Sequence, residues 1–402
     1  MTFAVGAVTG TVLTFEFGLL WPRFMGRFGG PFGIPFAIEG IFFFLEAIFI
    51  AIYIYGWRRM SPWPHFWTGV PIVISGIGGT FSVVAANAWM NTPAGFALDR
   101  TGKVVSVDPF GVIFNRATGY EVLHMVVSAY LVGGFLIASV YAVGMLRGRT
   151  GNYHRLGFLI PFTIAAIAAP VQIVVGDWAA RSVSQDQPVK FAAMELVPTT
   201  ASNVPVTIFG DINSNLQVRR TIQIPGLASL LTGYSTSTTI QGLDSVPASN
   251  RPSAAEVNIV HWSWDVMVGL GFALLGLSAW YGAYWWRRRS LPQTRWFLRA
   301  AAVAGAASVV AMEAGWTVTD VGRQPWIVYD IMRVADGATT YSGVWVTFVV
   351  ILAVYTAVIT ATILVLRTMA KRWRQEEIDE SDVPYGPRGR LPGPLPVPGA
   401  GS

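Results

Sequence analysis

The chain contains 402 residues, of which 53% are hydrophobic, 13% aromatic and only 12% charged. Soluble domains carry about 25% charged residues, so this composition excludes a soluble globule, a disordered chain and a fibre, and indicates a membrane protein with several spans. The absence of cysteine excludes disulfides, thiolate zinc sites, iron–sulfur clusters and covalently attached c-type haem. The net charge of +6 does not indicate a nucleic-acid partner, because the arginines flank hydrophobic segments, where they set membrane orientation.

Eight hydrophobic segments are long enough to cross a bilayer as helices, which takes about 20 residues each. We therefore predict an all-α integral membrane protein, in which about eight transmembrane helices form a bundle with one large external loop. The predicted helices cover residues 3–21, 33–57, 66–90, 118–146, 156–177, 257–286, 297–318 and 342–368.

These helices divide the chain into four regions. Residues 1–177 and 256–370 hold the membrane helices, and residues 178–255 form a loop rich in Ser, Thr, Asn and Pro. The tail, residues 371–402, is first acidic and then rich in Pro and Gly, which is typical of a disordered extension. Outside the large loop, one set of helix ends carries twice as many lysines and arginines as the other. The positive-inside rule therefore predicts a cytoplasmic N-terminus and tail and an external 178–255 loop.

Ionisable and ligand-type side chains inside the predicted spans are costly in a bilayer and are therefore functional candidates. Glu39 and Glu46 are two turns apart on one helical face, which suits a proton path or a cation site. The alternative is that each carboxylate only bonds a neighbouring helix. Counting the rise per residue places His124, Met267 and Glu313 in the outer half of the membrane. His124 and Met267 together suggest a low-spin haem b, although a packing histidine and a core methionine explain each residue alone.

Two motifs near the end of the chain are highly specific: Glu-Ala-Gly-Trp at 313–316 and Gly-Arg-Gln-Pro-Trp at 322–326. Other matching stretches, in chain order, are Ala-Ile-Glu-Gly (37–40), Phe-Leu-Glu (44–46), Ala-Asn-Ala-Trp-Met (86–90), the segment around 124, Gly-Asp (176–177), Val-Lys-Phe-Ala-Ala-Met-Glu (189–195), Ile-Gln-Ile-Pro (222–225) and Asp-Val-Met-Val-Gly (265–269). On these motifs the chain resembles subunit I of the cytochrome bd quinol oxidase family, with a short quinol loop, over about residues 3–368.

The resemblance implies the haem-bearing subunit of a terminal oxidase in a bacterial plasma membrane. Such an enzyme oxidises quinol on the outer side and reduces oxygen to water with protons from inside, which generates a proton gradient without pumping. The implied cofactors are a low-spin haem b, a high-spin haem b and haem d. The implied partners are quinol (menaquinol or ubiquinol), oxygen and a second membrane subunit, subunit II, and a small accessory subunit is compatible with this assignment.

The resemblance also assigns roles to individual residues. It places the ligands of the low-spin haem b on His124 and Met267 and the glutamate ligand of the high-spin haem b on Glu313, with Arg323 among the cofactor-binding residues. The proton-channel glutamates fall on Glu39 and Glu46, and the quinol-loop residues on Lys190 and Glu195. An exposed charged pair without a role is the alternative explanation of Lys190 and Glu195.

Two departures from the family pattern leave alternatives open. The chain starts where the second helix of the family would start, and the missing first helix carries a histidine ligand of the haem usually assigned as haem d. We expect a start codon assigned too late, and a chain that holds the low-spin haem b but does not hold the oxygen-reducing haem through a histidine. A b-type cytochrome or quinol dehydrogenase subunit without oxygen reduction is the alternative, and a haem-free transporter is a third. The family also often has Arg where this chain has Asp265.

Overall fold

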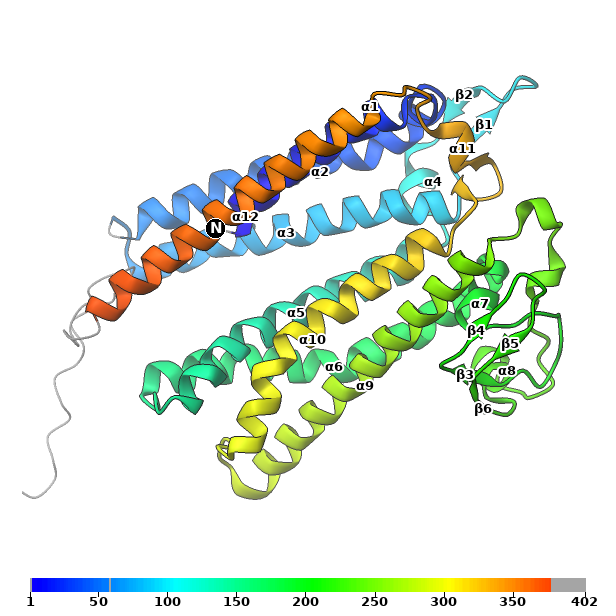
Figure 1. The fold of residues 1–402 in the computed structure, drawn as a ribbon. Coiled ribbons are helices and arrows are strands. Elements are labelled where there is room, and N and C mark those ends of the chain that lie inside the picture. Colours follow the sequence, from blue (N-terminus) through cyan, green and yellow to red (C-terminus); the bar gives the residue numbers. More distant parts are fainter. Residues whose placement is uncertain (1, 58, 377–402) are drawn as a thin grey trace, which may run out of the picture. The chain divides into compact units, whose positions relative to one another are not determined.

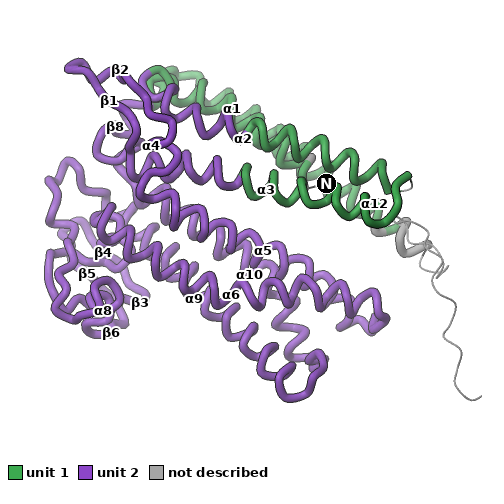
Figure 2. Tube along the Cα trace, turned by 180° about the vertical axis from the view of Figure 1, so that it is seen from behind, with its two compact units in different colours: residues 1–26, 40–79, 338–402 green, residues 27–39, 80–337 purple. Residues whose placement is uncertain are grey.

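The computed structural model describes residues 2–57 and 59–376, and most of them are helical (Figure 1). They divide into two compact units, which Figure 2 distinguishes by colour. Unit 1 comprises residues 1–26, 40–79 and 338–402, and unit 2 comprises residues 27–39 and 80–337. Among the described residues, seven helices have the length and hydropathy of membrane spans, which confirms the predicted all-α membrane architecture.

Unit 1 contains the first and last helices of the described residues, and α1 (Thr2–Leu20) contacts α12 (Val344–Glu376). The apolar part of α1, Val5–Leu20, is shorter than the seven longer spans. The predicted tail boundary was too early, because α12 continues helically through residues 371–376. The rest of the predicted tail, 377–402, lies outside the described residues, as does position 58 among the counted basic residues.

Two long helices contain residues of both units. They are α2 (Pro22–Gly56) and α3 (Pro62–Asn91), and each begins with a proline at its first position. Proline is favoured there because the first helical N–H has no partner within the helix.

Four long helices of unit 2 form a bundle: α5 (Thr118–Leu146), α6 (Asn152–Asp186), α9 (Ala254–Arg288) and α10 (Arg295–Val321). Each packs against the next in this order, and α10 returns to pack against α5, so the bundle closes on itself. In Figure 1 the four helices run alongside one another. Their core contains aromatic side chains that are fully or almost fully buried: Phe135, Phe158, Phe162, Tyr281 and Phe297.

Glycine lets neighbouring bundle helices approach closely. A Cβ atom on Gly134 of α5 would lie 2.6 Å from the carbonyl oxygen of Pro161 on α6. A Cβ atom on Gly305 of α10 would lie 2.6 Å from the hydroxyl oxygen of Ser139 on α5. Small residues at such contacts are typical of membrane helices, which gain their association energy from close packing.

The predicted 178–255 loop is an ordered segment. Its first nine residues, 178–186, continue α6, and α7 (Pro188–Met194) follows. The segment between α7 and α9 has its own hydrophobic core, which includes Ile212, Leu243 and the first turns of α9. Its remaining elements are β3 (Val206–Ile208) paired with β6 (Ile222–Ile224), β4 (Asp211–Ile212) paired with β5 (Val218–Arg219), α8 (Leu227–Gly233), and the short helices η1 (Leu243–Ser245) and η2 (Ala248–Asn250).

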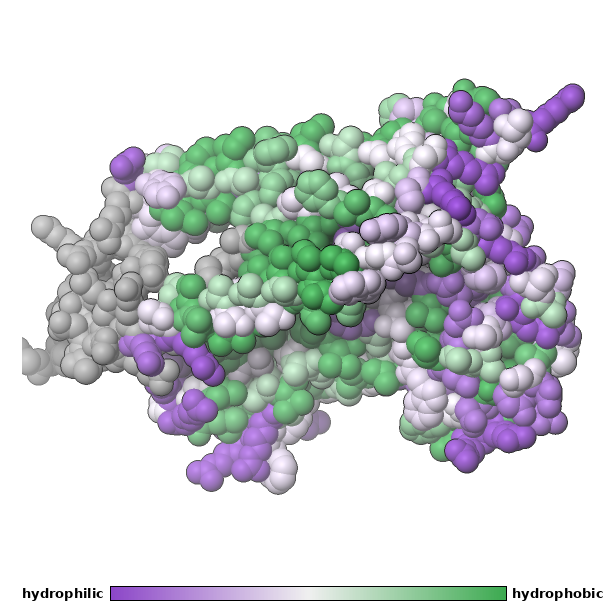
Figure 3. Space-filling model, turned by 45° about the horizontal axis from the view of Figure 1, so that its top comes forward, coloured by the Kyte–Doolittle hydropathy of each residue, from purple (hydrophilic) through white to green (hydrophobic). Residues whose placement is uncertain are grey.

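Short elements follow α3 and α10 in the chain. They are the hairpin of β1 (Phe96–Leu98) and β2 (Val104–Val107), α4 (Pro109–Ile113), the paired strands β7 (Trp326–Val328) and β8 (Met332–Arg333), and α11 (Val334–Gly337). Figure 3 shows hydrophobic residues along the lengths of helices and hydrophilic residues gathered near their ends. This distribution is the one that a bilayer requires.

Candidate functional site

A cavity of about 630 Å³ lies within unit 2. All four bundle helices line it, and α3, α7 and α8 contribute further residues. Most of the lining side chains are apolar, and a few are polar, among them Glu121, Lys190 and Glu195. The volume lies in the range of sites for large organic ligands, which are mostly apolar with a few placed polar groups.

Two predicted site residues, His124 and Met267, line this cavity from different helices, α5 and α9. The Nε2 atom of His124 lies 3.0 Å from the amide nitrogen of Gln172, whereas its Nδ1 atom is buried without a hydrogen-bond partner among the described residues. A Cβ atom on Gly176 would lie 3.5 Å from the His124 ring, and one on Gly315 would lie 3.0 Å from the sulfur of Met267. Each candidate ligand therefore packs closely against a glycine on a neighbouring helix.

These observations fit a haem group. An imidazole with an unpartnered ring nitrogen and a thioether are the side chains that ligate low-spin haem iron in b- and c-type cytochromes. The mostly apolar wall suits the porphyrin. Within the described part of the chain, no group of three His, Cys, Asp or Glu side chains could hold a bare metal ion.

Glu313 does not join His124 and Met267. It lies on α10 and is exposed, and the cavity is lined by its neighbours Met312 and Gly315 instead. One residue along a helix turns the side chain by about 100°. Any ligand of Glu313 must therefore lie on another face of α10.

The two predicted proton-path residues lie on α2. Glu39 belongs to unit 2 and Glu46 to unit 1, and both are partly buried. Neither residue lines the cavity. Their placement on one continuous helix matches the predicted spacing of two turns.

Lys190 and Glu195 are buried, with only 3% and 5% of their surface exposed, so they are not an exposed charged pair. Both line the cavity, Lys190 from α7 and Glu195 from the residue after it. Each has its own partners. The carboxylate of Glu195 accepts hydrogen bonds from the backbone N–H of Thr207 at 3.3 Å and from the indole N–H of Trp264 at 3.1 Å. Lys190 points instead into a polar network.

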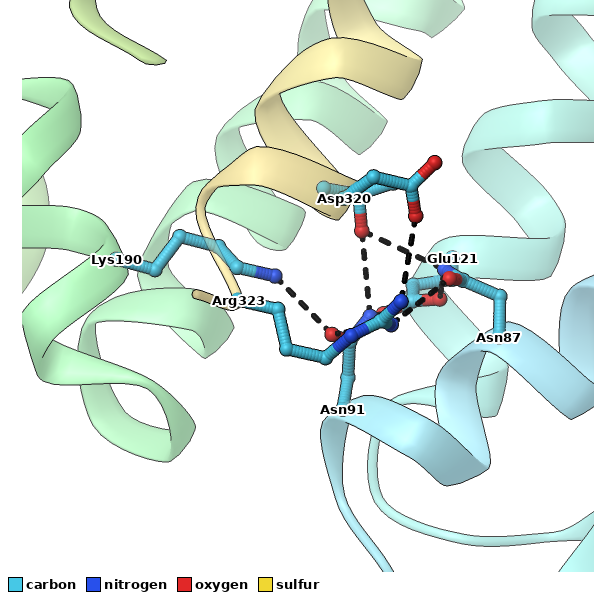
Figure 4. A network of polar contacts seen from close by, with 7 residues as sticks. Asn87, Asn91, Glu121, Lys190, Asp320 and Arg323 are labelled. Carbon is cyan, nitrogen blue, oxygen red and sulfur yellow. Dashed lines mark hydrogen bonds and ion pairs between the residues drawn. The ribbon is translucent and has the colours of Figure 1, made fainter. Parts of the chain in front are cut away.

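Figure 4 shows this network between α3, α5, α7 and the residues after α10. The Nζ atom of Lys190 donates to the side-chain oxygen of Asn91 at 3.1 Å. The amide nitrogens of Asn91 and Asn87 donate to the two carboxylate oxygens of Glu121, at 2.8 and 2.9 Å. Arg323 donates to the side-chain oxygens of Asn87 and Asn91, at 3.2 and 3.3 Å. Two cations and one carboxylate therefore share a pair of asparagine side chains.

The network reaches the protein surface at Asp320. The carboxylate of Asp320 accepts from Arg323 at 3.4 Å, and its side chain is 58% exposed, whereas that of Arg323 is 8% exposed. Arg323, which the sequence places among the cofactor-binding residues, does not line the cavity. It hydrogen-bonds Asn87 and Asn91, and its link to the cavity passes through these side chains.

Burial moves the pKa values of Lys190 and Glu195 toward neutral pH. Burial lowers the pKa of Lys190 to about 7, with Arg323 acting in the same direction and Glu121 opposing it. Burial also raises the pKa of Glu195 to about 7, against the hydrogen bonds from Thr207 and Trp264. A base and an acid that both titrate near neutral pH can exchange protons with a bound substrate.

Sequence reasoning missed Glu121 and the role of Asn87 and Asn91. Glu121 lies one turn before His124 in the first turn of a membrane span, where a carboxylate is itself a functional signal. Asn87 is part of the Ala-Asn-Ala-Trp-Met motif at 86–90, but a motif alone does not identify its hydrogen-bond partner.

Asp265 contacts the segment between α7 and α9. Its carboxylate accepts a hydrogen bond of 2.7 Å from the backbone N–H of Phe209 and lies 3.6 Å from Nε2 of the buried His261. Asp265 does not line the cavity. It therefore fixes the end of β3 against α9 rather than placing a charge inside the site.

The model of the family described as cytochrome bd terminal oxidase subunit I matches residues 1–373. This chain belongs to that family. The sequence-based family assignment is thereby confirmed, and it makes the chain part of a terminal quinol oxidase, an oxidoreductase of a family with haem cofactors. In this family, quinol and oxygen are the substrates and subunit II is the partner.

Curated and solved relatives agree with the family assignment. The chain is 32% identical to a putative cytochrome bd menaquinol oxidase subunit I of Bacillus subtilis, over 94% of this chain and 84% of the relative. It is 26% identical to the cytochrome bd-II ubiquinol oxidase subunit 1 of Escherichia coli, over 92% and 85%. The bd oxidase structure from Geobacillus thermodenitrificans superposes with a TM-score of 0.84 at 33% identity, covering 92% of this chain and 84% of that one.

Proposed function

We propose that this chain is the haem-bearing subunit that oxidises quinol on the outer side of a bacterial plasma membrane and reduces oxygen to water with protons from inside. One observation carries the proposal: a single cavity is lined by His124 and Met267 and also by Lys190 and Glu195. Candidate haem ligands and candidate quinol residues thus line one cavity, which suits electron transfer from a bound quinol.

His124 and Met267 would hold a low-spin haem b. When bound there, the haem accepts and passes on single electrons and leaves no coordination position for oxygen. Gln172 would orient the imidazole from α6, because its amide already contacts the ring at 3.0 Å. Gly176 and Gly315 would let the candidate ligands lie close to the neighbouring helices, since a side chain at either position would contact the ligand.

Lys190 and Glu195 would handle the quinol. The ammonium group of Lys190 donates a hydrogen bond to a quinol oxygen and stabilises negative charge that develops there. The carboxylate of Glu195 accepts a proton from a quinol hydroxyl, which its pKa of about 7 permits. Both residues lie in the segment between α6 and α9, residues 187–253, which the distribution of basic residues assigns to the outer side, so the protons would leave outside.

The oxygen-reducing part of the site would lie elsewhere in the chain. Glu313, on another face of α10, would ligate the high-spin haem b. Glu39 and Glu46 would conduct protons from the cytoplasm along α2. Because protons are released outside and taken up inside, a gradient forms without pumping. Subunit II is the expected membrane partner, and menaquinol and ubiquinol are both chemically suitable electron donors.

The test is anaerobic reduction of the purified two-subunit enzyme by a soluble quinol, followed by mixing with oxygen. We expect the reduced-minus-oxidised spectrum of haem b to develop with quinol and to reverse with oxygen. A preparation that holds haem b but is reduced only by dithionite would overturn the quinol site. One that quinol reduces but oxygen does not reoxidise would overturn oxygen reduction by this subunit.

A further inference from the structure

The bundle of unit 2 has one end at which all formal charges are positive. Between Glu121 and Asp177, and again between Asp265 and Glu313, the chain has no acidic residue. The turns from α5 to α6 and from α9 to α10 lie in these intervals, and the contact of Phe158 with Phe297 brings them to the same end. The arginines of this end are Arg147, Arg149, Arg155, Arg287, Arg288, Arg289, Arg295 and Arg299.

Exposed tryptophans lie among these arginines. Trp286 and Trp296 are each 73% exposed, and Trp285 is 45% exposed. They lie where the candidate spans of α9 and α10 end and begin, at Arg288 and Arg295. Exposed tryptophan at the ends of spans is typical of the headgroup level of a bilayer, so this end of the bundle meets lipid headgroups rather than bulk water.

Two guanidinium groups are held against these rings. Arg289 lies over Trp285 at 4.8 Å and near Trp286 at 5.6 Å, and Arg299 lies over Trp296 at 5.2 Å, measured to the ring centres. Within the described residues, the side chains of Arg289 and Arg299 form no hydrogen bond or ion pair. Stacking occupies the face of a guanidinium and leaves its N–H edge available for a phosphate.

We propose that Arg289 and Arg299, with their stacked tryptophans, bind the phosphate of an anionic phospholipid in the leaflet at this end. The rings hold the guanidinium groups at headgroup depth, and the hydrophobic flanks of α9 and α10 accommodate the acyl chains. A zwitterionic lipid carries a compensating cation beside its phosphate, which the arginine-rich end would repel. The site therefore selects net negative headgroups, and it is separate from the cavity between the helices.

The test uses the two-subunit enzyme in detergent with equal amounts of phosphatidylcholine and phosphatidylglycerol, and native mass spectrometry counts the lipids that remain bound. We expect phosphatidylglycerol to be enriched on the unaltered enzyme. In the double variant R289G/R299Q its retention relative to phosphatidylcholine should fall about 25-fold, from about fivefold per lost arginine near a membrane surface. Glycine is compatible with the backbone of position 289, where φ is +49°, so the turn is kept.

A matched variant controls for the loss of two charges. R100Q/K103Q removes two exposed cations from the β1–β2 hairpin, outside the arginine-rich end, and should keep the phosphatidylglycerol enrichment. R289K/R299K keeps the charge but loses the planar guanidinium groups that stack on the tryptophans. This variant should lose part of the phosphatidylglycerol enrichment. Equal retention in the unaltered enzyme and R289G/R299Q would overturn the site, as would an equal loss in R100Q/K103Q.

Discussion

The ammonium group of Lys190 donates a hydrogen bond of 3.1 Å to the side-chain oxygen of Asn91. The same asparagine donates to Glu121 at 2.8 Å, so it links a buried cation to a partly buried carboxylate without a hydrogen bond between them. Arg323 shares the oxygen of Asn91. This arrangement holds Lys190 at the cavity wall.

Replacement of Asn91 tests this link. N91A leaves Lys190, Glu121 and Arg323 each without one buried partner, and should destabilise the protein by about 3 kcal/mol, since breaking a buried charge network is costly. The measurement is the midpoint of thermal unfolding in detergent. The control N152A alters an exposed asparagine at the start of α6 and should leave the midpoint nearly unchanged. An N91A midpoint equal to that of N152A would mean that the network adds no stability.

The candidate haem ligands can be tested by absorbance. H124A and M267L should each abolish the low-spin haem b band, because each removes one axial ligand. M312L makes the same chemical change as M267L on another residue that lines the cavity, and should retain the band. A low-spin band that survives in both H124A and M267L would disprove the ligand assignment.

The pKa values of Glu195 and Lys190 predict a bell-shaped pH profile for haem reduction by quinol. Glu195 accepts a proton only when ionised, so the rate rises as the pH passes through its raised pKa of about 7. Lys190 donates only when protonated, so the rate falls as the pH passes through its lowered pKa, also about 7. The optimum should therefore lie close to neutrality.

Variants separate the two limbs of this profile. E195Q should lower the maximum rate and remove the acid limb. K190R should move the alkaline limb upward, because a guanidinium stays protonated where an ammonium group does not. Stopped-flow absorbance across a pH series is the measurement. Both limbs unchanged in both variants would show that other groups control the reaction.

The proposed proton path predicts that replacing Glu46 slows oxygen reduction but not haem reduction by quinol. E46Q should slow oxygen reduction by about 100-fold, the size expected for loss of a proton-transfer group, and leave haem reduction by quinol intact. Oxygen consumption and anaerobic stopped-flow reduction measure the two steps separately. An equal loss in both steps would indicate structural damage to α2 instead.

Replacement of Glu313 should affect one haem signal and not the other. Because Glu313 does not line the cavity of His124 and Met267, E313A should remove the high-spin haem b signal and spare the low-spin one. Electron paramagnetic resonance distinguishes the two spin states. Loss of both signals together would contradict two separate sites.

The membrane architecture followed from the chain alone, because about 20 consecutive apolar residues have few alternatives to a spanning helix. Helix ends were less predictable. The helices α6 and α12 run past the predicted boundaries, at Asp186 and Glu376, since a polar helical turn outside the hydrocarbon region leaves no hydropathy signal. Equal depth of His124 and Met267 also followed from counting residues, and both side chains line one cavity.

Tertiary structure decided which side chains face one another. Lys190 and Asn91 are 99 residues apart in the chain, and no local pattern records their hydrogen bond. The burial of Lys190 and Glu195 depends on the fold of the 187–253 segment, whose strands are only two or three residues long. The rotation of α10, which turns Gly315 toward Met267 and Glu313 away, is set by packing against α5 and α9. Hydropathy determines how deep a residue lies in the membrane, whereas the azimuth of its side chain depends on contacts between distant segments.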